Sequence, residues 1–137
     1  MCESKSVSLP LGAHFILLRD KSLANEEEEE YMSKVPYFKA TGSVIYLMVC
    51  TRPDLAYAIS TLSRFMINPG PIHWEMLKWL LRYLRGTFNI GLVHKHHSDK
   101  VRLKGFMNSD YAGDRDNRKF TSSYVLNLCD SYISWKS

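Results

Sequence analysis

The stretch that decides the fold is Pro71-Ile72-His73-Trp74-Glu75-Met76-Leu77-Lys78-Trp79-Leu80-Leu81-Arg82-Tyr83-Leu84-Arg85-Gly86. At the 100° per residue of an α-helix, its apolar side chains fill an arc of about 200°, wider than the stripe of an ordinary surface helix. A face that wide needs cover from two sides, so other elements must pack on it. Pro71 suits a first helical turn, and Gly86 follows the last periodic residue. The pattern predicts a helix over 71–86.

The polar side of this helix carries Lys78, Arg82 and Arg85 beside Glu75. Such a row of cations is a candidate for binding phosphate groups, and a simple solvated face explains it equally well. The net charge of +4 and the isoelectric point near 9.0 permit a nucleic-acid partner without requiring one.

Composition places the chain among soluble single domains. It has 137 residues, of which 45% are hydrophobic and 23% charged. Cys2, Cys50 and Cys129 form no Cys-x-x-Cys pair, which argues against a disulfide framework or a zinc ribbon and favours free thiols. We expect an intracellular protein, without a choice between cytoplasm and nucleus. The longest apolar run, 44–50, is too short to cross a bilayer, so no membrane partner is expected.

Three segments are predicted along the chain, and the first is an extended or disordered lead over 1–32. Pro10 and Gly12 interrupt regular structure there. Glu26 to Glu30 are five consecutive glutamates, whose mutual repulsion predicts a solvated acidic loop. A docking site for a basic partner is the alternative for this run.

The second segment, 33–88, is predicted to be helical. Ser33 is a candidate N-cap with Pro36 in the first turn. The apolar run 44–50 suits a helix or a buried strand, and the length of the segment favours a helix. After Thr51-Arg52-Pro53-Asp54 a further helix is expected, with an apolar arc of Leu55, Ala58, Ile59, Leu62, Phe65 and Met66. The break at 68–71 predicts that this helix packs antiparallel to the helix over 71–86.

The third segment, 89–137, is predicted to be a sheet, which gives the chain an α+β order. Strands are expected at 90–93, 101–107, 120–128 and 132–135, with turns at 94–100 and 112–118. His94, His96 and His97 lie close together in the first turn. They invite a metal hypothesis, but solvated turn histidines are the preferred interpretation.

Six collinear blocks carry a family resemblance. They are Met1-x-x-Ser4-Lys5-x-Val7-Ser8-x-Pro10-Leu11, Met32-Ser33-Lys34-Val35-Pro36-Tyr37, Thr51-Arg52-Pro53-Asp54-Leu55-Ala56, Trp74-Glu75 with Leu80-Leu81-Arg82-Tyr83-Leu84-Arg85-Gly86-Thr87, Asp110-Tyr111-Ala112-Gly113-Asp114, and Ile133-Ser134-Trp135-Lys136-Ser137. Together they cover essentially the whole chain. They resemble the Pol polyprotein of copia-type LTR retrotransposons, the plant members above all.

The resemblance implies a position within that polyprotein. It corresponds to the thumb and connection of the reverse transcriptase over 33–88, running into an incomplete antiparallel sheet of RNase H type over 89–137. It also implies that Lys78, Arg82 and Arg85, with Arg64, contact the backbone phosphates of an RNA/DNA hybrid.

The departures from the family pattern concern catalysis. RNase H chemistry needs clustered carboxylates that hold two Mg²⁺ ions. The family's Ser-Asp-Ala-Asp block reads Met107-Asn108-Ser109-Asp110 here, so a neutral Asn108 stands at the first catalytic position. Asp110, Asp114 and Asp116 are expected at or near a turn. We therefore expect no polymerase or nuclease activity, no catalytic residue and no bound metal or cofactor.

A glycine run of the family is also missing, because Cys129-Asp130-Ser131 stands in its place. The sequence thus predicts a catalytically inactive Pol fragment with at most non-specific hybrid binding. Two alternatives stay open. One is a non-catalytic protein-interaction module, and the other is a subunit that completes a reverse transcriptase or RNase H with another Pol fragment.

Overall fold

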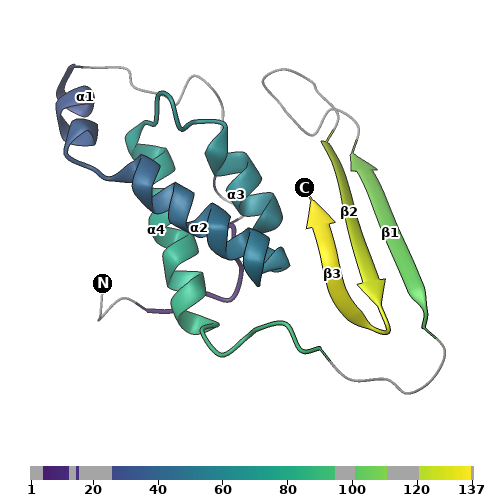
Figure 1. The fold of residues 1–137 in the computed structure, drawn as a ribbon. Helices are drawn as coiled ribbons and strands as arrows, with labels where there is room; N and C mark the ends of the chain where they lie inside the picture. Colours follow the sequence, from purple (N-terminus) through teal and green to yellow (C-terminus); the bar gives the residue numbers. More distant parts are fainter. Residues whose placement is uncertain (1–4, 13–14, 16–25, 95–100, 111–120, 137) are drawn as a thin grey trace.

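The computed structural model describes residues 5–12, 15, 26–94, 101–110 and 121–136 (Figure 1). Its elements are α1 (Glu26–Ser33), α2 (Tyr37–Cys50), the 3₁₀ turn η2 (Pro53–Leu55), α3 (Ala56–Ser63), α4 (Pro71–Gly86), β1 (Leu103–Asp110), β2 (Thr121–Leu128) and β3 (Ser131–Lys136). The helices gather on one side and the sheet lies beside them (Figure 1). No helix in the described part of the chain is both long and apolar enough to span a membrane.

The predicted helix over 71–86 is confirmed as α4, and it lines the core. Met76, Leu77 and Leu80 are fully buried, and Tyr83 is 8% exposed. The other buried apolar residues of the core cluster are Met32, Tyr37, Val44, Leu55, Ala58, Ile59 and Leu62. Each large aliphatic side chain contributes about 1.5–3 kcal/mol on burial. The wide apolar face of α4 is therefore covered by the helices that pack around it.

The helix over 44–50 is also confirmed, as the second half of α2. Its predicted start is wrong. Ser33 ends α1 and its hydroxyl donates to the carbonyl of Glu30 at 2.7 Å, so it does not cap α2. Pro36 precedes α2 without a side-chain cap. Further along, α3 and α4 run in opposite directions from their short link, as expected (Figure 1).

The acidic loop is the second wrong prediction, because the five glutamates form most of α1. Carboxylates in a first helical turn favour the positive end of the helix dipole, and glutamate is a good helix former. Lys34 adds an ion pair to Glu30, with Nζ and Oε1 2.8 Å apart. These local terms outweigh the mutual repulsion of the solvated charges. The segment boundary predicted at residue 32 therefore falls inside a helix.

The sheet is antiparallel with strand order β1-β2-β3. Its strands confirm three of the four predicted ones, with shifted ends. The strand expected at 90–93 is wrong, since these residues form no regular element. Ile90 and Val93 are mainly exposed, and the Val93 carbonyl accepts from the Ser131 hydroxyl at 3.3 Å. The predicted turn at 112–118 lies outside the described residues, as do His96 and His97.

A two-residue loop joins β2 to β3, because Leu128 pairs with Ser131 across Cys129 and Asp130. Both loop residues have positive φ angles, 49° and 62°. A two-residue hairpin loop with this backbone favours asparagine and glycine, because glycine has no Cβ and asparagine tolerates the left-handed region better than most side chains do. Cys129 and Asp130 therefore hold this turn under local strain.

Relieving this strain should stabilise the protein. We expect Cys129→Asn with Asp130→Gly to raise the free energy of unfolding by about 1–2 kcal/mol. Urea denaturation of the pair against the wild type measures it. Ser122→Gly, at an exposed strand position, is the control and should lower stability. Equal losses in both variants would contradict the assignment of strain to the turn.

Candidate functional site

The cationic face of α4 consists of Lys78, Arg82 and Arg85. Lys78 forms an ion pair with Glu75, and its Nζ lies 6.0 Å from the ring centroid of Trp74. The guanidinium carbon of Arg82 lies 5.3 Å from the ring centroid of Trp79. Such cation–π contacts restrict the positions that the charged groups of Lys78 and Arg82 can adopt.

The N-terminal lead lies against this face, which the sequence did not predict. The Nε of Arg82 donates to the carbonyl of Lys5 at 2.8 Å, and the indole N–H of Trp79 donates to the carbonyl of Leu9 at 3.0 Å. Phe15 meets Trp79 edge-on, with ring centroids 5.8 Å apart. Residues 5–12 have no regular secondary structure, as expected for an extended lead, but they are docked.

The fourth predicted cation, Arg64, is placed apart from the other three. Arg64 follows α3 on the link that leads to the start of α4, whereas Arg85 lies in the last turn of α4. A helix of 16 residues is about 24 Å long. The structure therefore gathers Lys78, Arg82 and Arg85 along one helix and sets Arg64 near its opposite end.

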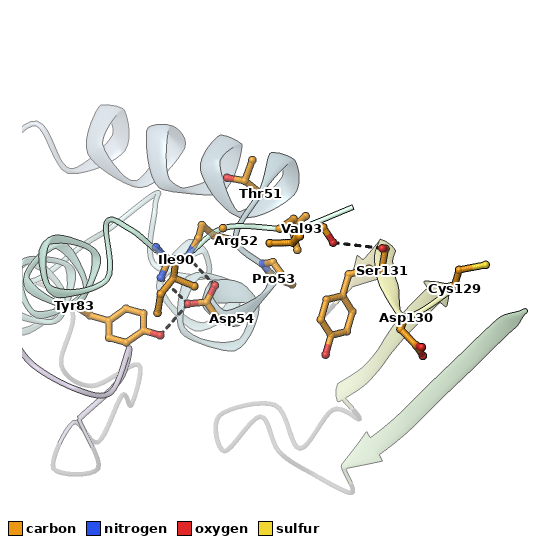
Figure 2. A pocket seen from close by; sticks show the side chains of 13 residues that line it. Thr51, Arg52, Pro53, Asp54, Tyr83, Ile90, Val93, Cys129, Asp130 and Ser131 are labelled. Atoms are coloured by element: carbon orange, nitrogen blue, oxygen red, sulfur yellow. Dashed lines mark hydrogen bonds and ion pairs between the residues drawn. The ribbon is translucent and has the colours of Figure 1, made fainter. Parts of the chain in front are cut away.

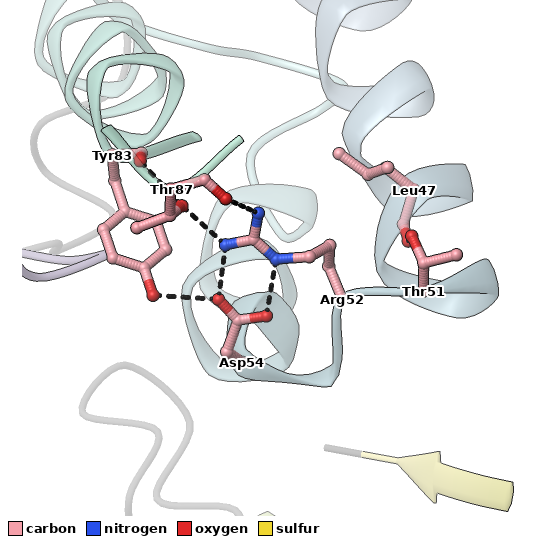
Figure 3. Close-up of polar contacts among 6 residues, drawn as sticks. All are labelled: Leu47, Thr51, Arg52, Asp54, Tyr83 and Thr87. Atoms are coloured by element: carbon pink, nitrogen blue, oxygen red, sulfur yellow. Dashed lines mark hydrogen bonds and ion pairs between the residues drawn. The ribbon is translucent and has the colours of Figure 1, made fainter. Parts of the chain in front are cut away.

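A second polar cluster joins the start of α3 to the end of α4 (Figure 3). Arg52 binds both carboxylate oxygens of Asp54, with Nε–Oδ1 at 2.9 Å and Nη2–Oδ2 at 2.7 Å. It also donates to the carbonyl of Thr87 at 3.0 Å and to its hydroxyl at 2.7 Å. The hydroxyl of Tyr83 donates to Asp54 Oδ2 at 2.9 Å. Arg52 is 4% exposed and the Asp54 side chain is 33% exposed, so this is a partly buried clamp between distant segments.

The ionisation of this cluster follows from its contacts. Burial alone would raise the pKa of Asp54, but hydrogen bonds from Arg52 and Tyr83 outweigh it and the pKa is lowered. Burial and the Asp54 carboxylate raise the pKa of Tyr83, and the bond to Asp54 raises the pKa of Arg52. The pair is therefore charged across the neutral pH range.

A cavity of about 620 Å³ opens beside this clamp (Figure 2). Its walls come from the start of α3, the irregular segment after α4 and the β2–β3 turn. Its lining residues are Thr51, Arg52, Pro53, Asp54, Tyr83, Ile90, Gly91, Leu92, Val93, Cys129, Asp130, Ser131 and Tyr132. In the last turn of α2, the carbonyl of Met48 accepts from the indole N–H of Trp135 at 3.0 Å, which links the sheet to the helices.

Asn108 lies on β1, where it is exposed and pairs with Ser123 of β2. An amide beside a hydroxyl does not fit a pair of Mg²⁺ ions, which need several carboxylate oxygens. Within the described ranges, no three or more His, Cys, Asp or Glu side chains are grouped to hold a metal ion. His94 is exposed, while Asp114 and Asp116 lie outside these ranges.

Sequence reasoning also missed His73, which is fully buried in the first turn of α4. Its Nδ1 accepts from the backbone N–H of Gly70 at 2.8 Å, and its ring stacks on Phe65 with centroids 4.0 Å apart. Its Nε2 is buried without a hydrogen-bond partner among the residues that the structure describes. Burial lowers the pKa of His73 to about 4. Its place at the third helical position after Gly70 is the local signal that could have identified this cap.

Comparisons with known proteins identify relatives along the whole chain. The retrovirus-related Pol polyprotein from transposon TNT 1-94 of Nicotiana tabacum is 47% identical over 137 residues, which are 100% of this chain and 10% of that protein. The polyprotein from transposon RE2 of Arabidopsis thaliana is 35% identical over 137 residues, again 100% of this chain and 9% of that protein. The chain thus spans a small part of these polyproteins.

A shorter relative is the secreted RxLR effector protein 161 of Plasmopara viticola. It is 44% identical over 106 residues, which are 77% of this chain and 74% of that protein. No protein-family model and no solved structure matches the chain. The matches to transposon polyproteins run over all 137 residues. On these similarities, the chain belongs to the family of retrovirus-related Pol polyproteins from transposons.

Proposed function

We propose that this chain corresponds to the C-terminal helices of a copia-type reverse transcriptase followed by the first strands of an RNase H domain. The order of the elements supports this, since helices over 26–86 precede an antiparallel sheet over 103–136. The sequence blocks of the copia-type family, collinear with this chain, are the second support. In this proposal the strands β1, β2 and β3 form an incomplete sheet of RNase H type.

The activity we propose is non-specific binding to the backbone of an RNA/DNA hybrid, without catalysis. The observation that carries it is the row of three cations along α4, two of them held over tryptophan rings. Cations in one row can follow the phosphates of a duplex and read no base sequence. Asn108, a neutral amide on β1, supports the lack of nuclease chemistry.

Charge reversal tests this binding. A labelled RNA–DNA hybrid is titrated in a KCl series, followed by fluorescence anisotropy. We expect Lys78→Glu with Arg82→Glu and Arg85→Glu to lower affinity about a hundredfold at low salt, and to reduce the salt slope by about 2.7, because three phosphate contacts are lost. Base sequence should not matter.

The matched control reverses the exposed Lys34, Lys39 and Lys104, which changes net charge equally on other elements. Equal losses in both triple variants would show that net charge, not the face of α4, controls binding. Incubating the same hybrid with Mg²⁺ tests the absence of catalysis. Cleavage that co-purifies with the folded protein would overturn that part of the proposal.

One observation favours the alternative of a protein-interaction module. Phe106 and Met107 on β1 are 60% and 88% exposed, and β1 is an edge of the three-stranded sheet. Exposed strand edges with apolar side chains pair readily with other chains. For the further alternative, a subunit of a larger enzyme, co-purification with another Pol fragment is the discriminating result.

A further inference from the structure

We propose that the docked lead and α4 form one composite phosphate-binding surface, in which Lys5 is an additional cation and residues 5–9 position Arg82. This inference rests on the proposed function and names residues that no family pattern assigns to it. The supporting contacts join residues that are 77 and 70 positions apart, Lys5 with Arg82 and Leu9 with Trp79.

The first step is the orientation of Arg82. Its Nε is bound to the Lys5 carbonyl, and its guanidinium lies over the Trp79 ring. These two contacts fix the plane of the guanidinium before any ligand arrives. A guanidinium held through Nε and stacked on a ring directs its terminal nitrogens outward, the geometry that suits bidentate phosphate binding. Preorganisation of this kind lowers the entropic cost of binding.

The second step concerns Lys5 itself. Lys5 is exposed, and its own carbonyl is the group that Arg82 binds. The Lys5 side chain therefore branches from the same residue whose carbonyl binds Arg82. Docking of the lead thus adds a fourth positive charge to the row of Lys78, Arg82 and Arg85, a charge that the helix alone does not carry.

The third step is the fit of the lead on α4. Val7 and Leu11 pack against the helical core as partly buried side chains. At the end of α4, a Cβ built on Gly86 would lie 2.8 Å from the Cβ of Ser6 and 3.6 Å from the carbonyl oxygen of Val7. The lead therefore passes so close to Gly86 that only a residue without a side chain leaves room for it.

This close approach allows a test that changes no charge. Gly86→Ala should push residues 5–7 away from α4 and weaken hybrid binding about tenfold at low salt, with a salt slope reduced by between about 0.9 and 1.8, because Lys5 leaves and Arg82 loses its orientation. The double variant Ser6→Gly with Gly86→Ala removes the clash and should restore wild-type binding. Circular dichroism melts confirm that each variant is folded.

Two further variants test the charge of Lys5 and the contact between Trp79 and the lead separately. They use the same anisotropy assay with the labelled RNA–DNA hybrid. Lys5→Gln should reduce the salt slope by about 0.9, whereas Lys34→Gln, the control in the turn after α1, should leave it unchanged. Trp79→Phe keeps a ring beneath Arg82 but removes the N–H that binds Leu9, so it should act like Gly86→Ala.

The outcomes separate the two proposals. If reversal of Lys78, Arg82 and Arg85 abolishes binding while Gly86→Ala, Trp79→Phe and Lys5→Gln all bind like the wild type, the composite surface is overturned and the proposed function stands. Tighter binding by Gly86→Ala would also overturn it, because the lead would then cover the cations. If the wild type does not bind or the triple reversal has no effect, both proposals fall together.

Discussion

Replacing Arg52 with alanine is expected to lower the free energy of unfolding by roughly 3 kcal/mol. Arg52 makes four hydrogen bonds, two to Asp54 and two to Thr87, and its side chain is only 5% exposed. Its removal leaves the Thr87 carbonyl without this donor, and it leaves the Asp54 carboxylate with the Tyr83 hydroxyl but without its cation. The figure is at the lower end for broken buried pairs because the Asp54 side chain is 33% exposed and water can partly replace the guanidinium.

The loss of stability should affect more than the contacts of Arg52 itself, because the clamp connects segments that are distant in sequence. Arg52 and Asp54 lie where the chain turns into α3, whereas Tyr83 and Thr87 lie at the end of α4, about 30 residues later. Thr87 in turn donates to the carbonyl of Tyr83 at 2.9 Å. Without Arg52, Thr87 loses both of its hydrogen bonds to the segment before α3, and the bond between Tyr83 and Asp54 remains (Figure 3).

Urea denaturation at pH 7 measures the effect. Arg102→Ala is the control, since Arg102 is an exposed arginine near β1, and it should change stability by less than about 0.5 kcal/mol. Arg52→Met combined with Asp54→Leu removes both charges, so it should recover most of the loss. If that double variant were no more stable than Arg52→Ala, an uncompensated carboxylate would not be the cause.

The elements that sequence predicted well are those with a strong local pattern. The helix over 71–86 has a wide apolar arc, a proline at its start and a glycine at its end, and each agrees with α4. Composition also predicted strands over 120–128 and 132–135, and the structure has them as β2 and β3 with slightly shifted ends. The wrong predictions concern competing local terms. The glutamates of 26–30 repel one another, but they also suit the start of a helix, and this preference outweighs the repulsion.

The candidate site was less predictable because its contacts connect distant positions. Periodicity places Lys78, Arg82 and Arg85 on one side of α4, but it cannot show that the Lys5 carbonyl binds Arg82. Arg52 belongs to a recognisable block, yet its partner Thr87 lies 35 residues away. The strand expected at 90–93 failed for the same reason. An apolar run forms a strand only where a neighbour is available to pair with it.

The geometry of the cationic face also depends on contacts between segments that are distant in sequence. Its charges come from one helix, but their orientation depends on the lead and on the clamp that holds the end of α4. A short peptide with the sequence of 71–86 therefore should not reproduce the surface, because it lacks the carbonyls of Lys5 and Leu9 that bind Arg82 and Trp79. The proposed function belongs to the folded chain as a whole.

Lowering the pH from 7 to 4.5 is expected to remove about 2.4 kcal/mol of stability through His73 alone. Burial lowers its pKa from 6.5 to about 4, so the folded protein keeps the ring neutral. Between these values the unfolded chain binds a proton that the folded chain does not. Stability from His73 is therefore complete above pH 6.5 and is lost as the pH falls towards 4.

The surroundings of His73 explain why the folded state disfavours protonation of its ring. Nδ1 accepts from the N–H of Gly70, and Nε2 is buried without a hydrogen-bond partner in the described part of the chain. An imidazolium would therefore carry an unpaired buried charge against the Phe65 ring. His73→Phe keeps the stacking partner but cannot titrate. It should have lower stability at pH 7, where it loses the Gly70 cap, and a flatter dependence on pH between 6.5 and 4.5.

The measurement is urea denaturation at several pH values across this window, which lies above the range in which Asp54 titrates. His94→Gln serves as the control because His94 is exposed, so its removal should leave the wild-type slope in place. If His73→Phe and the wild type lost the same stability between pH 6.5 and 4.5, another group would have to account for the acid sensitivity. If the dependence of unfolding free energy on pH disappears only when His73 is replaced, the folded state favours the neutral form of this ring.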